Sequence, residues 1–170
     1  FIRGGIGNDT LNGGADDDVL RGEENSDPMN GGDGNDRLFG GLGQDTLNGD
    51  AGRDVLRGEE QNDILNGGDG GDQLFGGDAH DVLDGGAGND RLYGGAGRDF
   101  LTGGLGADLF IFDAGDSGPT VATADVITDF NASDGDRIDL SFIRTMFGNN
   151  IPFTFLGLNV FGGIGNPEIR

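Results

Sequence analysis

The sequence contains no cysteine, no lysine and a single histidine, His80. Without cysteine there is neither a disulfide framework nor a thiolate metal site, so hard oxygen ligands remain, and these suit calcium or magnesium. One histidine cannot build the HExxH zinc site of a metalloprotease, and no GxSxG segment of a lipase is present. We therefore expect a non-catalytic module with no catalytic residue and no organic cofactor.

Apolar residues are scarce at 34%, while glycine occurs 38 times, a composition that on its own is typical of disorder. The 31 acidic residues outnumber ten basic ones, all arginines, and the formal net charge is −21. Such a charge opposes compaction and excludes nucleic acid as a partner, so cations are the expected partners. No apolar run reaches the roughly 20 residues of a transmembrane segment, and Phe1-Ile2-Arg3 lacks the pattern of a signal peptide.

Glycine is not scattered but periodic. From Gly4 to Ile111 the chain divides without insertion into twelve nine-residue units of the form GGxGxDxUx, where U is a large apolar residue. Position 8 is leucine in ten units, with Met29 and Phe110 in the others. Position 6 is always aspartate, namely Asp9, Asp18, Asp27, Asp36, Asp45, Asp54, Asp63, Asp72, Asp81, Asp90, Asp99 and Asp108.

The repeat predicts an all-β solenoid. The glycine-rich hexapeptide of each unit is expected to form a turn, because glycine accepts positive φ, and the xUx triplet a short strand with position 8 facing inward. Two units complete one coil, so that each unit stacks on the next but one. The pattern GGxGxDxUx is that of RTX (hemolysin-type) calcium-binding repeats, and the chain is identified as a member of this family, which implies a parallel β-roll, a solenoid similar to a right-handed β-helix.

Stacked coils repeat roughly every 4.8 Å, which places the position-6 carboxylates in one repulsive row along each edge. Calcium between successive turns would neutralise them, since it takes six to eight oxygens from carboxylates and from carbonyls that the glycine turns expose. Turn capping without metal is the alternative for these aspartates. Six turns on each edge leave at most five inter-turn sites per edge, or about ten calcium ions in all.

The two edges differ in their glycines. The turns of odd-numbered units, the odd edge, lack glycine at position 2 or 4 at Glu23, Asn25, Glu59, Gln61 and Ala79, and of these Asn25 tolerates the left-handed conformation best. The turns of even-numbered units, the even edge, depart from the pattern only at Asp16 and Asp50. We therefore predict tighter calcium binding on the even edge, through Asp18, Asp36, Asp54, Asp72, Asp90 and Asp108 and the turns at Gly32, Gly34, Gly52, Gly68, Gly70, Gly86, Gly88, Gly104 and Gly106.

The period stops after Ile111, and we expect two parts, a roll over 1–111 and a capping β segment, truncated, over 112–170. Residues 125–130 and 136–141 resemble the segment that follows the repeats in serralysin-type metalloproteases, type I secreted lipases and alginate epimerase R-modules. The resemblance implies further calcium ligands there, for which Asp116, Asp125 and Asp129 are candidates beside the alternative of surface turns. It also implies type I secretion and a secreted, extracellular parent protein whose remaining chain is a partner of this module.

Arginine and aromatic residues gather on the outer face formed by the xUx triplets of even-numbered units, whereas the other outer face carries Asn12, Asn30, Asn48 and Asn66. Such a face could hold an anionic polysaccharide, with arginine pairing with carboxylates and rings stacking on sugars. The alternative is that the arginines lie over the rings as cation-π pairs. The residues of this candidate ligand face are Arg21, Arg37, Phe39, Arg57, Phe75, Arg91 and Tyr93.

Overall fold

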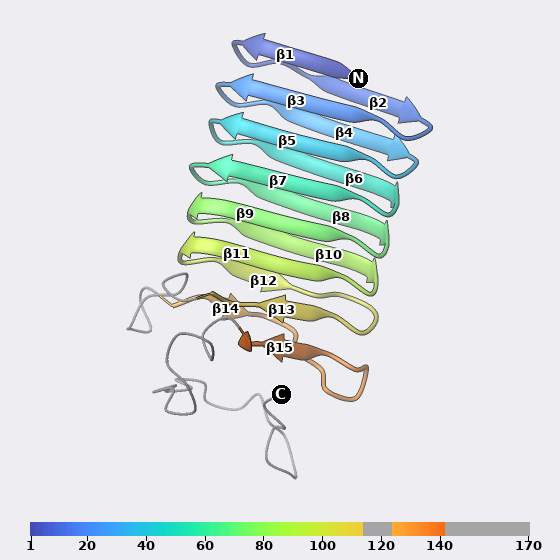
Figure 1. The fold of residues 1–170 in the computed structure, drawn as a ribbon, viewed down its shortest axis with the longest axis vertical. Helices are drawn as coiled ribbons and strands as arrows, with labels where there is room; N and C mark the ends of the chain where they lie inside the picture. The colour runs from blue at the N-terminus through green and yellow to red at the C-terminus, as the bar shows by residue number, and fades with distance from the viewer. Residues whose placement is uncertain (114–123, 142–170) are drawn as a thin grey trace.

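The computed structural model describes residues 1–113 and 124–141 of the chain. They form a parallel β-solenoid in which the chain passes alternately between two sheets, one coil after another (Figure 1). Neighbouring strands within each sheet are parallel and come from successive coils, as the repeat predicts. In the described ranges, no helix has the length and apolar character needed to span a membrane.

The strands divide into two layers by their order in the chain. The eight-stranded sheet contains β1 (Ile2–Ile6), β3 (Val19–Glu24), β5 (Arg37–Leu42), β7 (Val55–Glu60), β9 (Gln73–Ala79), β11 (Arg91–Gly97), β13 (Leu109–Ile111) and β15 (Arg137–Asp139). The seven-stranded sheet contains β2 (Leu11–Ala15), β4 (Pro28–Asp33), β6 (Thr46–Gly52), β8 (Ile64–Gly70), β10 (Val82–Gly88), β12 (Phe100–Thr102) and β14 (Val126–Ile127).

A single column of side chains fills the space between the sheets. All twelve position-8 residues, from Leu11 to Phe110, are at most 3% exposed and form one cluster. Successive members sit in register, as Leu38 with Leu56 and Leu65 with Leu83. At roughly 2 kcal/mol for each buried leucine, this column supplies the apolar stabilisation that the composition made look too small.

The strands are longer than the predicted triplets. β3, for example, runs from position 7 of one unit to position 3 of the next, and Glu23 and Glu24 still pair with Gly41 and Leu42 of β5. The prediction that the whole hexapeptide is a turn was therefore wrong, because the parallel hydrogen-bond ladder continues through the first glycines. In such coils the reversal of direction is confined to about positions 4 to 6.

Beyond the repeats, each sheet gains one more strand. β14 pairs with β12, and β15 pairs with β13, with Ile127 beside Leu101 and Ile138 beside Phe110. Ile127, Phe130 and Ile138 pack against the leucine column. The further strands expected within 142–170 lie outside the described residues, so the capping role of 112–170 stays a prediction.

Candidate metal centre

The position-6 aspartates form two hydrogen-bonded ladders, one along each edge of the solenoid. In each ladder the Oδ1 atom of an aspartate accepts the backbone N–H of the aspartate one coil earlier, as in the 2.7 Å bond from Asp36 to Asp54 on the even edge. The equivalent bond on the odd edge, from Asp45 to Asp63, is 2.8 Å long. Ten of the twelve side chains are buried. The fold thus brings all twelve position-6 aspartates into two rows.

The second oxygen of these carboxylates, Oδ2, is buried and lacks a hydrogen-bond partner among the described residues. The set comprises Asp9, Asp27, Asp36, Asp45, Asp54, Asp63, Asp72, Asp81, Asp90 and Asp108. Burying an ionised group without a partner costs several kcal/mol, and a bound cation removes that cost. Turn capping explains Oδ1 but leaves Oδ2 unexplained, so these side chains fit a metal ion better than the alternative without one.

Burial also changes the acidity of the ladder. Desolvation, opposed by the backbone N–H that binds Oδ1 and helped by neighbouring carboxylates, raises the pKa of Asp54, Asp63, Asp81 and Asp90 to about 7. The pKa is also raised for Asp27, Asp36, Asp45, Asp72 and Asp108, with desolvation as the largest cause. A proton and a cation are therefore alternative ways to neutralise the same oxygens.

Glycine at position 1 is invariant in the repeats, and the structure gives a reason that our sequence analysis missed. A Cβ added to Gly67 would lie 2.5 Å from Asp72 Oδ2 and 2.6 Å from the Gly85 carbonyl oxygen of the next coil. Similar clashes recur in other coils, where a Cβ added to Gly58, for example, would overlap with Asp63 Oδ2. Position 1 is thus glycine because the position-6 carboxylate packs directly on its Cα. The unbroken column at position 1 was the available signal.

Glycines at positions 2 and 4 have a different reason, because their φ angles are positive. All nine even-edge glycines that were predicted to shape the sites have φ between 94° (Gly104) and 151° (Gly70). A Cβ at Gly70 or Gly88 would lie 1.4 or 1.2 Å from the carbonyl oxygen of the matching residue one coil earlier. Carbonyl oxygens of one turn therefore project toward the next turn, where a bound calcium ion would need them.

The non-glycine residues at positions 2 and 4 keep this backbone conformation. They are Asp16 (73°), Glu23 (82°), Asn25 (77°), Asp50 (69°), Glu59 (82°), Gln61 (74°) and Ala79 (89°), five of them on the odd edge. A residue with a Cβ is strained in this region by roughly 1 to 2 kcal/mol, less for asparagine and aspartate. Both edges thus keep the turn geometry, and tighter calcium binding on the even edge stays a prediction.

Carboxylates alone do not complete a site. Nowhere in residues 1–113 and 124–141 do three or more histidine, aspartate or glutamate side chains converge as a metal cluster. The oxygens for one ion must therefore combine aspartate side chains with backbone carbonyls of two stacked turns, a mixture that calcium accepts. The pattern of donors, rather than any one residue, defines the candidate metal centre.

Both ladders end on aspartates that follow the repeats. Asp125 Oδ1 accepts the Asp99 N–H at 3.0 Å, and Asp136 Oδ1 accepts the Asp108 N–H at 3.0 Å. Asp136 was not among our candidates, although Asp136-Arg137-Ile138 repeats the DxU spacing of the units. Its Oδ2 accepts the Asn131 N–H at 2.7 Å, so both oxygens have partners.

Asp129 has a similar end-of-ladder role. Its two oxygens accept the N–H groups of Gly103 and Gly104 at 2.9 and 2.8 Å, in the last glycine turn. The predicted ligands Asp125 and Asp129 thus lie at the solenoid end, where the structure shows them as acceptors of backbone hydrogen bonds. Asp116 lies outside the described residues.

The candidate ligand face lies on the eight-stranded sheet, where cation-π pairs are present. Arg21 lies over the Phe39 ring at 4.4 Å, and Arg57 over the Phe75 ring at 4.6 Å. Phe75 in turn is 6.1 Å from the ring of Tyr93. Arg37 and Arg91 are exposed at the starts of β5 and β11. This arrangement matches the alternative of arginines over aromatic rings, and polysaccharide binding stays an untested prediction.

A parallel solenoid with buried, half-satisfied carboxylates and projecting carbonyls at its turns is a metal-binding β-roll. The family of RTX calcium-binding nonapeptide repeats (four copies) matches residues 1–27, 21–56, 39–74, 48–83, 75–110 and 84–117, which cover more than half of the chain. The chain belongs to this family, and its repeats form a calcium-binding β-roll. No curated protein matches the chain.

Proposed function

We propose that this chain is a calcium-dependent folding module of a secreted protein, which at alkaline pH is compact only when calcium occupies the inter-turn sites. The observation that carries the proposal is the row of buried Oδ2 atoms without hydrogen-bond partners. Each stacked coil adds buried carboxylates to a chain that already has a net charge of −21. Calcium neutralises them only in the stacked state, so binding and folding are one equilibrium.

Calcium concentration then decides where the module folds. Extracellular calcium modules bind with dissociation constants of roughly 10⁻⁴ to 10⁻³ M, far above cytosolic calcium. A chain of this kind stays extended in the cytosol and folds after export, which supports type I secretion of the protein to which it belongs and an extracellular location. The repeats contribute calcium-linked stability rather than catalysis, so in this proposal any enzymatic activity belongs to other parts of that protein.

Compaction on calcium binding tests the proposal. We expect the radius of gyration, measured by small-angle X-ray scattering, to approach about 44 Å in excess chelator, the value for an unfolded chain of this length. Calcium should reduce it toward about 16 Å, the value for a compact domain of this length. Magnesium at the same concentration is the control, and it should leave the chain expanded because it demands octahedral geometry and dehydrates reluctantly. A chain equally compact with chelator and with calcium would refute the proposal.

A further inference from the structure

The position-5 side chains form a second ladder outside the aspartates. On the even edge, Asp17 Oδ1 accepts the Asn35 N–H at 2.8 Å, and Asn35 Oδ1 accepts the Arg53 N–H at 3.1 Å. Further along, Asn89 Oδ1 accepts the Ala107 N–H at 2.8 Å. Each of these side chains thus satisfies the exposed N–H of the following coil.

The ladder is interrupted at two successive coils. Position 5 is Arg53 in one even-numbered unit, and arginine has no acceptor atom. The unit stacked one coil later has Gly71, which has no side chain. Accordingly, neither the Gly71 N–H nor the Asn89 N–H donates a hydrogen bond to any residue in the described ranges. Because each ladder side chain accepts the position-5 N–H of the following coil, the Asn89 N–H points toward the space that a side chain on residue 71 would fill.

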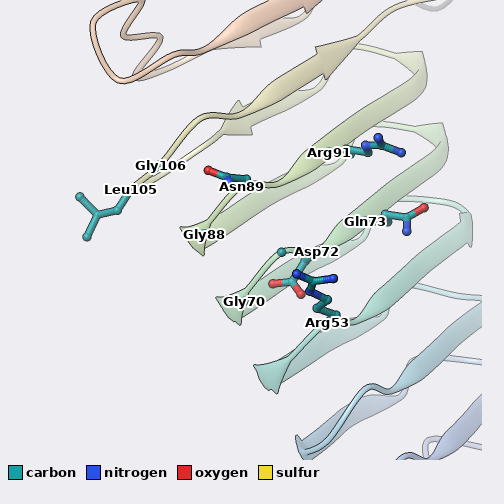
Figure 2. A pocket seen from close by; sticks show the side chains of 10 residues that line it. Arg53, Gly70, Asp72, Gln73, Gly88, Asn89, Arg91, Leu105 and Gly106 are labelled. Carbon is teal, nitrogen blue, oxygen red and sulfur yellow. The ribbon is translucent and has the colours of Figure 1, made fainter.

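That space is a hollow of about 640 Å³ on the even edge. Figure 2 shows residues of its lining, with Arg53, Gln73 and Arg91 in three successive coils and Asn89 directly after Gly88. A Cβ on Gly71 would approach nothing closer than 3.5 Å, so the absence of a side chain at residue 71 leaves this part of the hollow open.

Positive charge gathers at the hollow. Arg53 and Arg91 are both exposed, and neither pairs with a carboxylate within the described part of the chain, although the chain is strongly acidic. Asp72 also lines the hollow. Its Oδ1 accepts the Asp54 N–H, and its Oδ2 is one of the buried oxygens without a hydrogen-bond partner among the described residues. Calcium on Asp72 would leave the two guanidinium groups and the Asn89 N–H as the uncompensated groups.

We propose that this hollow is an oxyanion site, which binds a carboxylate, sulfate or phosphate group between Arg53 and Arg91 when calcium occupies the even edge. Guanidinium groups and unpaired backbone N–H groups are the donors that such anions use. The dependence on calcium rests on the proposed function, whereas the site itself rests on the interrupted ladder. An anion here would supply the acceptor that residue 71 lacks and would tie three coils together.

The test is a titration of the calcium-loaded chain with sodium sulfate at constant ionic strength, followed by amide shifts in ¹⁵N-¹H NMR spectra. We expect saturable shifts of the Gly71 and Asn89 amides, with chloride as the inert control. Methyl sulfate, run in parallel, distinguishes the sources of the group: tighter binding of the ester indicates an oxyanion presented by a larger molecule, and tighter binding of sulfate indicates a free ion. Both results support the site.

Variants separate the site from general charge effects. Arg53→Gln and Arg91→Gln should each weaken sulfate binding about tenfold, as expected for loss of one charge-assisted donor. Arg37→Gln is the matched control, because Arg37 has the same position in its unit as Arg91 but does not line the hollow. Gly71→Asn should abolish binding while the fold is kept, because its side chain can accept the Asn89 N–H.

Two results would overturn the site: unsaturable shifts in the wild-type chain, or equal affinity in the Arg91→Gln and Arg37→Gln variants. Circular dichroism of the same samples keeps the two proposals apart. A chain that folds with calcium but does not bind sulfate refutes only the oxyanion site. A chain that is already folded in chelator and binds sulfate there refutes the calcium-dependent folding and leaves the site standing.

Discussion

Aspartates inside the roll and aspartates at its end differ in the hydrogen-bond partners of their two carboxylate oxygens. Asp72, in the middle of the even ladder, uses one oxygen for a backbone N–H and buries the other without a partner. Asp136, at the end of the same ladder, uses both oxygens for backbone N–H groups. The second oxygen of the interior aspartate therefore calls for a cation or a proton, whereas both oxygens of Asp136 are satisfied by the polypeptide.

The largest expected effect comes from filling the space on which an interior carboxylate packs. Gly67→Ala places a Cβ 2.5 Å from Asp72 Oδ2 and 2.6 Å from a backbone carbonyl. We expect a loss of about 3 kcal/mol in the free energy of unfolding, measured by urea denaturation in saturating calcium. Gly71→Ala is the control, with no contact closer than 3.5 Å and an expected change within about 1 kcal/mol. Equal effects of the two substitutions would contradict the packing.

Amide substitutions on the two kinds of aspartate should separate calcium binding from hydrogen bonding. Asp72→Asn keeps an acceptor for the Asp54 N–H but loses the charge, so we expect the calcium concentration at half-folding to rise about tenfold. Asp136→Asn places the side-chain NH2 group opposite one of the two backbone N–H donors that Asp136 accepts. We expect it to lower the free energy of unfolding by about 1 to 3 kcal/mol. That cost should be the same at every saturating calcium concentration.

The comparison fails if the two variants respond alike. Calcium titrations followed by circular dichroism, with urea denaturation at two saturating calcium concentrations, measure both quantities on the same samples. A calcium midpoint that moves more for Asp136→Asn than for Asp72→Asn would place the cation at the solenoid end instead of in its interior.

Acid should partly replace calcium in the interior. Folding raises the pKa of Asp54, Asp63, Asp81 and Asp90 to about 7, above the usual value near 3.9 for an unfolded aspartate. The folded metal-free chain therefore binds more protons than the unfolded chain. The stability that these four protonated groups contribute is fully present below about pH 4 and is lost as the pH rises through about 7. In excess chelator, the β signal should be larger at pH 5 than at pH 8. A signal independent of pH, or larger at pH 8, would contradict these shifts.

The smallest effect concerns the strained turns of the odd edge. Gln61 holds φ at 74°, so Gln61→Gly should stabilise the calcium-loaded chain by about 1 kcal/mol in thermal or urea denaturation. Asn25→Gly should gain less, because asparagine tolerates this region better than glutamine. If neither substitution stabilises the chain, strain at these turns is not what distinguishes the two edges.

Much of the fold could be predicted because every repeat places its residues in the same structural environment. The leucine column, the stacking of each unit on the next but one and both rows of aspartates follow directly from the nine-residue period. The length of the strands could not be predicted in this way, since glycine suggests turns while the parallel ladder continues through Gly40 and Gly41.

Features that depend on contacts between coils were also beyond the sequence. The invariant glycine at position 1 reflects a carboxylate that packs on its Cα, a contact that no local propensity encodes. Asp136 joins its ladder across 28 residues instead of 18, because the regular period has ended before it. Only the DxU spacing in Asp136-Arg137-Ile138 could have indicated its place.

The most direct test of the account is far-UV circular dichroism of the chain at pH 8 in excess chelator, followed by stepwise addition of calcium. We predict little β signal in chelator and a cooperative gain as calcium fills the interior ladders, because ten buried Oδ2 atoms have no other partner among the described residues. A full β signal in chelator at that pH would contradict the claim that cations hold the coils together.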